Sequence, residues 1–344
     1  MSIIEAIKRV VAGESLTEDA AAGVAGKIMA GGASDAQIAA LLVALRLKGE
    51  SVDEIVGFAR AMRGGAASIA LKSPDVIDTC GTGGDGIGTF NISTVAAFVA
   101  AGAGCKVAKH GNRSNSSRSG SADVLEALGV DIQLPPERTG ELIDAIGVGF
   151  LFAPQYHPGA RHAAAARREI GVRTIFNAIG PLTHPARAAR QLMGVYDGRL
   201  TEPMAHVLAR LGSVHCLVVH GEDGLDEVTL TGRTWVSELK DGVVTTYSIH
   251  PCDFGMETIV NHEPLRGGAP ADNARLAREI LGGAQGPRRE ITLLNAGAAI
   301  YVGGVARTLA DGVRLAGQSI DSGRALEKLD ALIVAGGSGG GARE

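Results

Sequence analysis

Residues 76–86 read Val-Ile-Asp-Thr-Cys-Gly-Thr-Gly-Gly-Asp-Gly (VIDTCGTGGDG) and place a glycine loop directly after a β-strand pattern. Gly81, Gly83 and Gly86 have the Gly-x-Gly-x-x-Gly spacing of a dinucleotide-binding turn. Backbone N–H groups in such a turn point at phosphate oxygens, because no side chain prevents their close approach. The stretch therefore predicts an α/β fold with a phosphate site, and it leaves open which phosphate is held there.

Two features downstream of the glycines disfavour a nicotinamide dinucleotide. That ligand requires a helix that begins within the motif and an acidic residue about twenty residues further on, which holds the ribose hydroxyls. Residues 87–94 (IGTFNIST) instead delay the helix pattern, and the next strand is followed by the basic run KHGNR at 109–113. An NADP oxidoreductase stays open as an alternative, because Arg113 suits a 2′-phosphate.

The segment from Gly104 to Ala122 contains Lys and Arg side chains and no acidic residue. Its interleaved Ser and Asn side chains supply hydrogen-bond donors, so the composition suits a ligand with several phosphate oxygens. By itself such a segment is most often a solvated basic loop. Because it follows the glycine loop by only one helix, we expect the two loops to share a ligand.

Acidic residues near the phosphate loop predict a divalent cation. Asp85 lies within the glycine loop, where a carboxylate repels phosphate unless a cation or a hydroxyl group intervenes. Asp226 and Glu227, in GLDEVTL at 224–230, follow a strand pattern that ends at Val219. Mg²⁺ bound to phosphates takes one or two carboxylates, and ligands of open α/β sheets bind at the carboxyl ends of strands. The alternative is a solvated acidic turn.

Composition excludes several other classes of protein. The 344 residues carry a net charge of -4 and only 3% aromatic residues, so neither nucleic acid nor a membrane is expected as a partner. The four cysteines lie far apart, which disfavours a zinc ribbon. The N-terminus has no signal-peptide pattern, and the longest apolar run is too short to span a bilayer. We expect a cytoplasmic protein.

The order of helix and strand patterns predicts two domains. Capping boxes at Ser15, Ser34 and Ser51 open three helices in the first seventy residues, and each of these helices ends near glycine. Strand and helix patterns then alternate, which is typical of a mostly parallel sheet flanked by helices. Strands are expected at 76–79, 105–108, 214–219, near Val228 and at 243–249, and helices at 94–103, 121–129, 201–211, 309–320 and 324–334.

We therefore predict a small helical domain joined to a larger α/β domain with a central, mostly parallel sheet. The helical domain comprises residues 1–72 and is completed by 165–190, where helix patterns return. The α/β domain comprises 73–164 and 191–335. Residues 336–344 have nothing to bury and are expected to form a flexible tail.

Four blocks of sequence, in this order, resemble the anthranilate phosphoribosyltransferase family of the nucleoside-phosphorylase-like class. They are 81–94 (GTGGDGIGTFNIST), 109–129 (KHGNRSNSSRSGSADVLEALG), 167–186 (RREIGVRTIFNAIGPLTHPA) and 224–230 (GLDEVTL). The resemblance implies phosphoribosyl transfer from 5-phosphoribosyl 1-pyrophosphate (PRPP) to the amine of anthranilate, with Mg²⁺, in tryptophan biosynthesis. It also implies a homodimer formed through the helical domain. His184 stands where the family has Asn, which we interpret as neutral.

The resemblance also implies three sets of binding residues. The donor set is Gly81, Gly84, Asp85, Thr89, Asn91, Ile92, Ser93, Thr94, Lys109, His110, Gly111, Asn112, Arg113, Ser114, Asn115, Ser116, Ser117 and Ser121. The anthranilate set is Gly81, Asn112 and Arg167, and the metal set is Ser93, Asp226 and Glu227. No general acid or base is assigned, because the aniline nitrogen is a neutral nucleophile; His110 is expected to pack or hydrogen-bond near anthranilate.

Two further alternatives are open besides the oxidoreductase. A nucleoside phosphorylase of the same broad fold would leave Arg167 and Asn112 without a carboxylate to hold. A non-enzymatic phosphate-binding protein would not need the acidic residues Asp85, Asp226 and Glu227, all of which are present.

Overall fold

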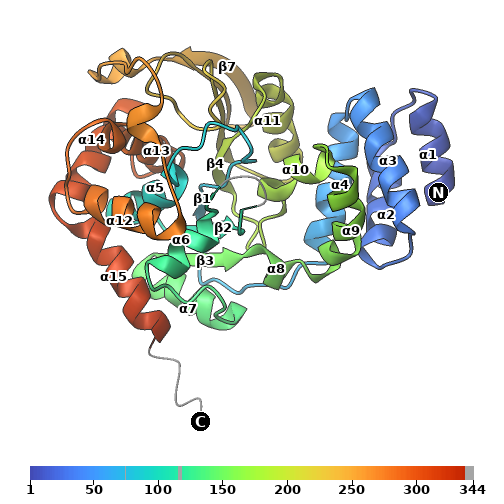
Figure 1. Cartoon of the computed structure of the whole chain (residues 1–344), viewed down its shortest axis with the longest axis horizontal. Helices are drawn as coiled ribbons and strands as arrows, with labels where there is room; N and C mark the ends of the chain where they lie inside the picture. Colours follow the sequence, from blue (N-terminus) through green and yellow to red (C-terminus); the bar gives the residue numbers. More distant parts are fainter. Residues whose placement is uncertain (74, 115–117, 338–344) are drawn as a thin grey trace, which may run out of the picture.

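The computed structural model describes residues 1–73, 75–114 and 118–337. A small helical lobe lies at one end of the molecule and an α/β lobe at the other (Figure 1). The N-terminal helices of the small lobe are α1 (Ile3–Val11), α2 (Glu18–Met29), α3 (Asp35–Lys48) and α4 (Val52–Gly64). Ser34 and Ser51 cap α3 and α4 in capping boxes, as predicted.

The predicted capping box at Ser15 is wrong. Thr17 is the N-cap of α2, and its side chain accepts a hydrogen bond from Ala20 N at 3.3 Å. The helix begins later because Leu16 is buried and its N–H donates to Glu54 Oε1 at 2.9 Å, which keeps the preceding turn out of the helix. Ser15 instead accepts a hydrogen bond from Lys48 Nζ.

The α/β lobe is built on a seven-stranded sheet with the order β3-β2-β1-β4-β5-β6-β7. Strands β3, β2, β1, β4 and β5 run parallel, and β6 and β7 continue antiparallel. The bounds are β1 Ile77–Asp78, β2 Val107–Gly111, β3 Val148–Phe152, β4 Arg190–Gly194, β5 His215–Gly221, β6 Thr234–Lys240 and β7 Val243–Ile249. The prediction of a mostly parallel sheet is confirmed.

The strand expected near Val228 does not form. Val228 N donates to Asn295 Oδ1 and Val228 O accepts from Asn295 Nδ2, both at 2.9 Å. With both backbone groups bound to one side chain, no partner strand can pair at this residue. The segment is a loop between β5 and β6.

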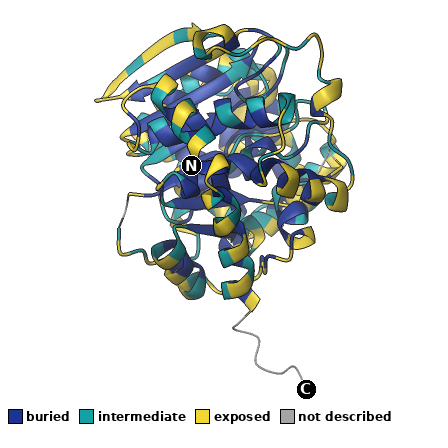
Figure 2. Cartoon of the chain, turned by 90° about the vertical axis from the view of Figure 1, so that its left-hand side faces the viewer, coloured by how far each residue is buried: buried dark blue, intermediate teal, exposed yellow. Residues whose placement is uncertain are grey.

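Side chains of β5 divide between the two faces of the sheet. Leu217 and Val219 belong to the core beneath α5 (Ile92–Gly102) and α13 (Pro287–Val302), whereas Cys216 and Val218 belong to the core shared with α11 (Thr201–Arg210). This alternation is the period of two expected of a strand buried on both faces. Figure 2 shows the central strands buried, with exposed residues on the edge strand β7 and on the outer helices.

Helices cover the face of the sheet that carries Leu217 and Val219. Apart from half-buried Ser93, every residue of α5 is buried, so α5 is the central helix of this layer. Gly102 permits its close packing, because a Cβ there would lie 2.7 Å from Ala325 N. The other helices of this lobe are α6 (Ser121–Ala127), α7 (Pro136–Ile146), α8 (Ala153–Tyr156), α12 (Pro270–Leu281), α14 (Leu309–Asp321) and α15 (Arg324–Gly337).

The segment between β3 and β4 returns to the helical lobe (Figure 1). It contains η1 (Pro158–Ala163), α9 (Ala164–Ile170), α10 (Ile175–Ala178) and η2 (Gly180–Thr183). Ala166 and Phe176 share a core with the side chains of α2, α3 and α4, and this core continues to one face of the sheet. The domain boundaries at 72, 165 and 190 therefore stay a prediction.

At the C-terminus, a flexible tail was expected at 336–344, but its first two residues belong to α15, which ends at Gly337. Residues 338–344 lie outside the described part of the chain. No helix in the described ranges has both the length and the apolar character to cross a bilayer.

Candidate active site

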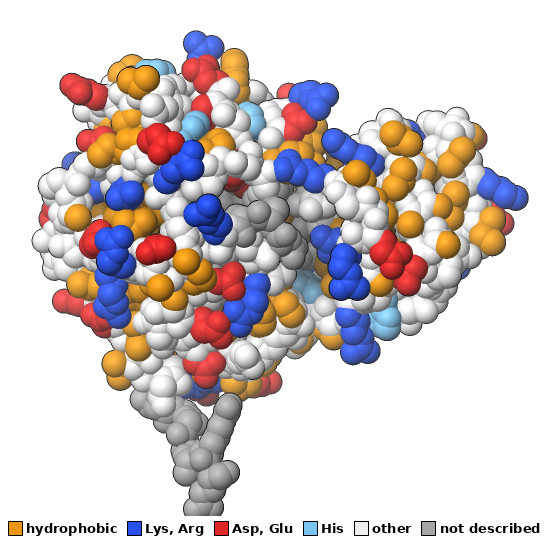
Figure 3. Space-filling model, viewed as in Figure 1, with side chains coloured by type: hydrophobic (Ala, Val, Ile, Leu, Met, Phe, Trp, Pro, Cys, Tyr) orange, Lys and Arg blue, Asp and Glu red, His pale blue; other side chains and the backbone are white. Residues whose placement is uncertain are grey.

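Loops that follow β1, β2, β4 and β5 meet at the carboxyl edge of the sheet, on the side facing the helical lobe (Figure 1). Figure 3 shows a hollow between the two lobes, with Lys and Arg side chains on both of its sides. This is the position at which open α/β sheets bind ligands. The sequence motifs with phosphate and metal chemistry lie in these loops.

The glycine loop after β1 has a left-handed backbone at Gly83, Gly84, Gly86 and Gly88, with φ between +65° and +81°. Gly81 approaches its neighbours closely, since a Cβ there would lie 3.1 Å from Asp226 Oδ2. Thr82 fixes the loop to the end of β4: Thr82 N donates to Gly194 O at 2.9 Å, and Tyr196 N donates to Thr82 Oγ1 at 3.1 Å.

Asn91 and Ser93 connect the start of α5 to neighbouring loops. Asn91 Nδ2 donates to Ser119 O at 3.1 Å and Asn91 Oδ1 accepts from Asn273 Nδ2 at 2.8 Å. Ser93 N donates to Glu227 Oε1 at 3.2 Å. The side chains of Ile92 and Thr94 are buried, and the Thr94 hydroxyl has no hydrogen-bond partner among the described residues.

Asp226 and Glu227 lie against the glycine loop and the start of α5. Asp226 Oδ2 accepts a hydrogen bond from Gly83 N at 2.7 Å, which brings it beside the loop that carries Asp85. Burial raises the pKa of Asp226, and the charge of Asp85 adds to the effect. Burial and the charge of Asp226 likewise raise the pKa of Glu227. Carboxylates held close together in this way favour a bound cation.

The oxygen donors of this acidic cluster fit Mg²⁺. No group of three or more His, Cys, Asp and Glu side chains in the described residues could hold a metal alone. Mg²⁺ does not require one, because it takes one or two carboxylates together with waters and substrate phosphates. Buried Lys109 offsets part of the negative charge beside Glu227, and its Nζ donates to Thr79 O at 2.8 Å and to Ser93 Oγ at 3.3 Å.

The basic loop after β2 is partly tied to α6. The Arg113 guanidinium binds Asp123 at 2.9 Å and Glu126 at 2.8 Å, so its charge is shared with two carboxylates. Asn112 Oδ1 accepts from Arg113 N at 2.7 Å, and Ser121 Oγ donates to Asn112 O at 3.3 Å. Ser114 N donates to Asp123 at 3.1 Å. The predicted donor residues Asn115, Ser116 and Ser117 lie outside the described residues.

Arg167 lies on α9 in the helical lobe. The guanidinium lies 5.1 Å from the centre of the Phe176 ring and has no carboxylate partner within the described residues. Burial lowers its pKa, yet the guanidinium stays charged at neutral pH because its ordinary pKa is so high. A half-buried, unpaired guanidinium is suited to a planar carboxylate.

His110 is buried at the end of β2, between the rings of His157 and His184 at 5.3 and 5.8 Å. Burial and the neighbouring imidazoles lower its pKa well below the ordinary value, so the ring is neutral. Its Nε2 has no hydrogen-bond partner among the described residues. A neutral ring of this kind can hydrogen-bond a ligand and is a weak base.

Sequence reasoning missed three residues of this region. Arg173 donates to Gly84 O and lies 4.4 Å from the centre of the Tyr196 ring, which connects the helical lobe to the glycine loop. Thr82 anchors that loop from within it. Neither Tyr196 nor Arg173 belongs to a local chemical pattern, so only the tertiary fold brings them to the site.

Family models match both lobes of the chain. A model described as the helical bundle domain of a glycosyl transferase family covers residues 4–66, and one described as the a/b domain of that family covers residues 73–326.

Two proteins of similar sequence carry the same name. Anthranilate phosphoribosyltransferase from Symbiobacterium thermophilum is 54% identical over 326 residues, which cover 95% of each chain. The protein of the same name from Moorella thermoacetica is 55% identical over 328 residues, covering 95% of this chain and 96% of that one.

Solved structures have the same fold. Anthranilate phosphoribosyltransferase from Thermus thermophilus superimposes with a TM-score of 0.91 at 47% identity, covering 96% of this chain and 98% of that one. The Saccharomyces cerevisiae enzyme in complex with PRPP and Mg gives 0.89 at 28% identity, and its complex with 4-fluoroanthranilate gives 0.87 at 27%, each covering 98% of both chains. With relatives this similar over almost its whole length, the chain belongs to the anthranilate phosphoribosyltransferase family.

Proposed function

We propose that this protein transfers the phosphoribosyl group of PRPP to the amine of anthranilate, in tryptophan biosynthesis. The products are N-(5-phosphoribosyl)anthranilate and pyrophosphate. The observation that carries the proposal is the contact of Asp226 with the glycine loop and of Glu227 with the start of α5, within a chain 54% identical to a named anthranilate phosphoribosyltransferase.

The donor is held at the carboxyl edge of the sheet. Backbone N–H groups of the glycine loop and of the start of α5 face the acidic cluster, where they can donate to pyrophosphate oxygens. Lys109 lies beneath these groups as a buried cation. In the free protein, the carboxylates of Asp226 and Glu227 accept from the N–H groups of Gly83 and Ser93, so donor binding exchanges these contacts for phosphate.

Mg²⁺ fits this site through Asp226 and Glu227, with Ser93 beside them. Support comes from the raised pKa values of the two carboxylates and from the Saccharomyces cerevisiae structure that contains PRPP and Mg. When bound, the ion neutralises charge on the pyrophosphate leaving group.

The acceptor is oriented from the helical lobe. Arg167 offers two parallel N–H donors to the anthranilate carboxylate, and Asn112 and Gly81 lie on the loops that hold the donor. The likeness to the structure with 4-fluoroanthranilate supports a site for this class of acceptor.

Catalysis then rests on position and electrostatics. The chain brings a neutral amine and an anomeric carbon together, and its N–H groups and Lys109 stabilise charge on the departing pyrophosphate. Buried, neutral His110 hydrogen-bonds near the acceptor, and no proton transfer by it is needed before the C–N bond forms.

Product identification separates this function from a nucleoside phosphorylase. Protein incubated with Mg²⁺, PRPP and anthranilate should yield a product with the mass of phosphoribosylanthranilate. A parallel reaction with purine and pyrimidine nucleosides and free phosphate should release no base. Phosphate-dependent release of base, without the anthranilate product, would overturn the proposal.

A further inference from the structure

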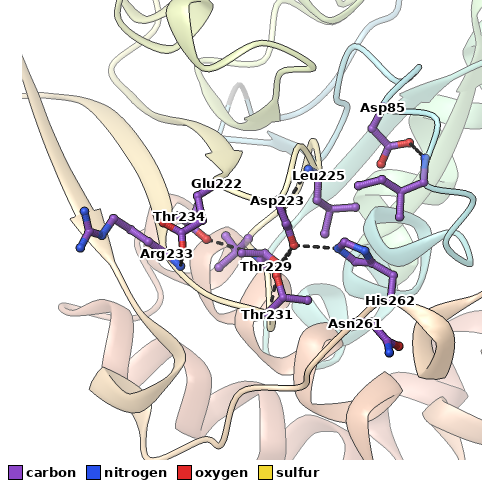
Figure 4. Close-up of polar contacts among 12 residues, drawn as sticks. Asp85, Glu222, Asp223, Leu225, Thr229, Thr231, Arg233, Thr234, Asn261 and His262 are labelled. Atoms are coloured by element: carbon purple, nitrogen blue, oxygen red, sulfur yellow. Dashed lines mark hydrogen bonds and ion pairs between the residues drawn. The ribbon is translucent and has the colours of Figure 1, made fainter.

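The loop that carries Asp226 and Glu227 is held closed by Asp223. Asp223 Oδ1 accepts a hydrogen bond from Leu225 N at 3.1 Å, on one side of the acidic pair. Its Oδ2 accepts from the hydroxyls of Thr229 and Thr231, on the other side (Figure 4). One carboxylate therefore joins the two ends of the metal-binding loop.

His262 connects this carboxylate to a second part of the chain. His262 Nε2 lies 2.8 Å from Asp223 Oδ2, and the two side chains are 24% and 13% exposed (Figure 4). Burial disfavours ionisation of Asp223, but hydrogen bonds from the threonines, His262 and Leu225 outweigh it and lower its pKa. The histidine thus faces an ionised carboxylate with few competing waters, which strengthens the contact.

His262 begins a segment, residues 262–267, that also contacts the glycine loop; we call it the brace segment. It includes η5 (Glu263–Leu265). Phe90 N donates to Leu265 O at 3.0 Å, Gly267 N donates to Gly88 O at 3.0 Å, and Thr89 pairs with Arg266 in an isolated bridge. The brace segment therefore contacts Asp223 at one end and residues 88–90 at the other.

The packing leaves little freedom at the glycine-loop end. Leu265 is fully buried, and a Cβ on Gly267 would lie 2.8 Å from both Phe90 Cα and Thr89 O. At the other end, His262 contacts Asp223 beside the acidic pair, and a backbone hydrogen bond from Ile259 N to Leu230 O at 3.1 Å supports this contact. A shift of His262 would thus be transmitted to residues 88–90.

We propose that His262 is a positioning residue for the donor site, and this inference rests on the proposed function. Paired with Asp223, it fixes the metal-binding carboxylates relative to residues 88–90, so that one pyrophosphate can contact both. Small displacements in such a site cost much of its affinity. Arg167 and Asn112 belong to other elements, so binding of the acceptor should depend little on His262.

The test compares three variants with the wild-type chain. His262→Leu removes the donor to Asp223, His262→Gln keeps an N–H donor in its place, and His206→Leu changes a 52% exposed histidine on α11 as the matched control. Calorimetric titration with pyrophosphate in the presence of Mg²⁺ measures the donor site without turnover. Steady-state kinetics give the KM of PRPP and of anthranilate separately.

We expect His262→Leu to weaken pyrophosphate binding and to raise the KM of PRPP by roughly tenfold, as for loss of a hydrogen bond to a charged group. The KM of anthranilate should stay within about twofold of wild type. His262→Gln should recover most of the affinity, and His206→Leu should behave as wild type. His262→Ala replaces the leucine variant if the latter does not fold.

Three results would overturn the inference. Unchanged pyrophosphate affinity in folded His262→Leu would exclude the positioning role. Equal rises in both KM values, with no recovery in His262→Gln, would mean a general loss of structure. A wild-type chain that binds no pyrophosphate would overturn the proposed function itself, and with it the proposed role of His262.

Discussion

Single side chains in this molecule gain their chemistry from burial. Arg167 and His110 are ordinary residues in sequence, yet one is a half-buried guanidinium without a carboxylate and the other a neutral, enclosed imidazole. Burial is the main cause of the lowered pKa of both side chains. Substitutions at this scale therefore test which substrate each residue serves.

Arg167→Ala should raise the KM of anthranilate by roughly thirtyfold and that of PRPP much less, because a charge-assisted carboxylate contact is lost. Arg168→Ala, at the exposed neighbouring position, is the matched control and should leave both values near wild type. Steady-state kinetics with each substrate varied in turn measure the difference. Unchanged anthranilate kinetics in Arg167→Ala would remove this residue from the acceptor site.

His184 should make the protein sensitive to acid. Burial lowers the pKa of His184, and also that of His157, from about 6.5 to about 4. Between these values the unfolded chain binds protons that the folded chain does not, so stability is lost as the pH falls through this window. Each such histidine contributes about 1.4 kcal/mol per pH unit within it.

His184→Asn should reduce the number of protons that the chain takes up on unfolding by about one, and so reduce the slope of the unfolding free energy with pH. Asn can still donate to Ala108 O, which His184 Nε2 contacts at 2.6 Å. Urea unfolding at pH 7, 6 and 5 measures the slope, with His206→Asn at the exposed control position. Parallel slopes for wild type and His184→Asn would show that the pKa of His184 is the same in the folded and the unfolded chain, which would contradict the lowered pKa.

At the scale of elements, capping boxes predicted the start of a helix correctly where no distant residue binds the backbone of that turn. Ser34 and Ser51 were recognised by their capping boxes, whereas Ser15 failed because Glu54, distant in sequence, binds Leu16 N. Thr17→Ala should therefore cost about 1 kcal/mol in the free energy of unfolding, and Ser15→Ala less than about 0.5. Urea denaturation measures both; a larger cost for Ser15→Ala would contradict the observed cap.

Several elements of the α/β lobe were not predicted, among them the helices α7, α12 and α13. β7 was predicted with its observed bounds, but β3, β4 and β6 were not predicted. β4 begins with Arg190 and Gln191, whose polar side chains are satisfied by distant partners, so its sequence lacks a continuous apolar pattern. The false strand at Val228 has the opposite cause, since Asn295 from α13 captures an apolar, β-branched segment.

The sequence predicted the loops of the candidate site but not the contacts that hold these loops together. The motifs located the glycine loop, the basic run and the acidic pair, because phosphate and metal chemistry restrict residue types locally. The links among these loops come from Tyr196, Arg173 and His262, which no local pattern distinguishes. Such contacts depend on the tertiary fold alone.

At the scale of the whole molecule, an apolar groove lies on the outside of the helical lobe. It has a volume of about 630 Å³ and is lined by residues of α1 and α3, among them Val10, Val43 and Leu47. Val11 and Leu47 are 71% and 82% exposed. We infer that a second copy of the chain covers this face, in agreement with the homodimer expected through the helical domain.

We predict that the wild-type chain sediments as a dimer and Leu47→Glu as a monomer, because the substitution places a charge on the apolar face. Sedimentation velocity over a range of protein concentrations measures this change. Val243→Glu, at a 62% exposed position on the edge strand β7, is the control and should leave the dimer intact. A Leu47→Glu chain that sediments as wild type would place any interface elsewhere.

The fluorescence of anthranilate tests the central claim most directly. Purified protein is mixed with Mg²⁺, PRPP and anthranilate, and the signal is followed together with the pyrophosphate released. We predict a loss of fluorescence that requires every component, with one pyrophosphate formed per anthranilate consumed. Constant fluorescence, from a folded protein that still binds PRPP, would contradict the assignment of anthranilate as the acceptor.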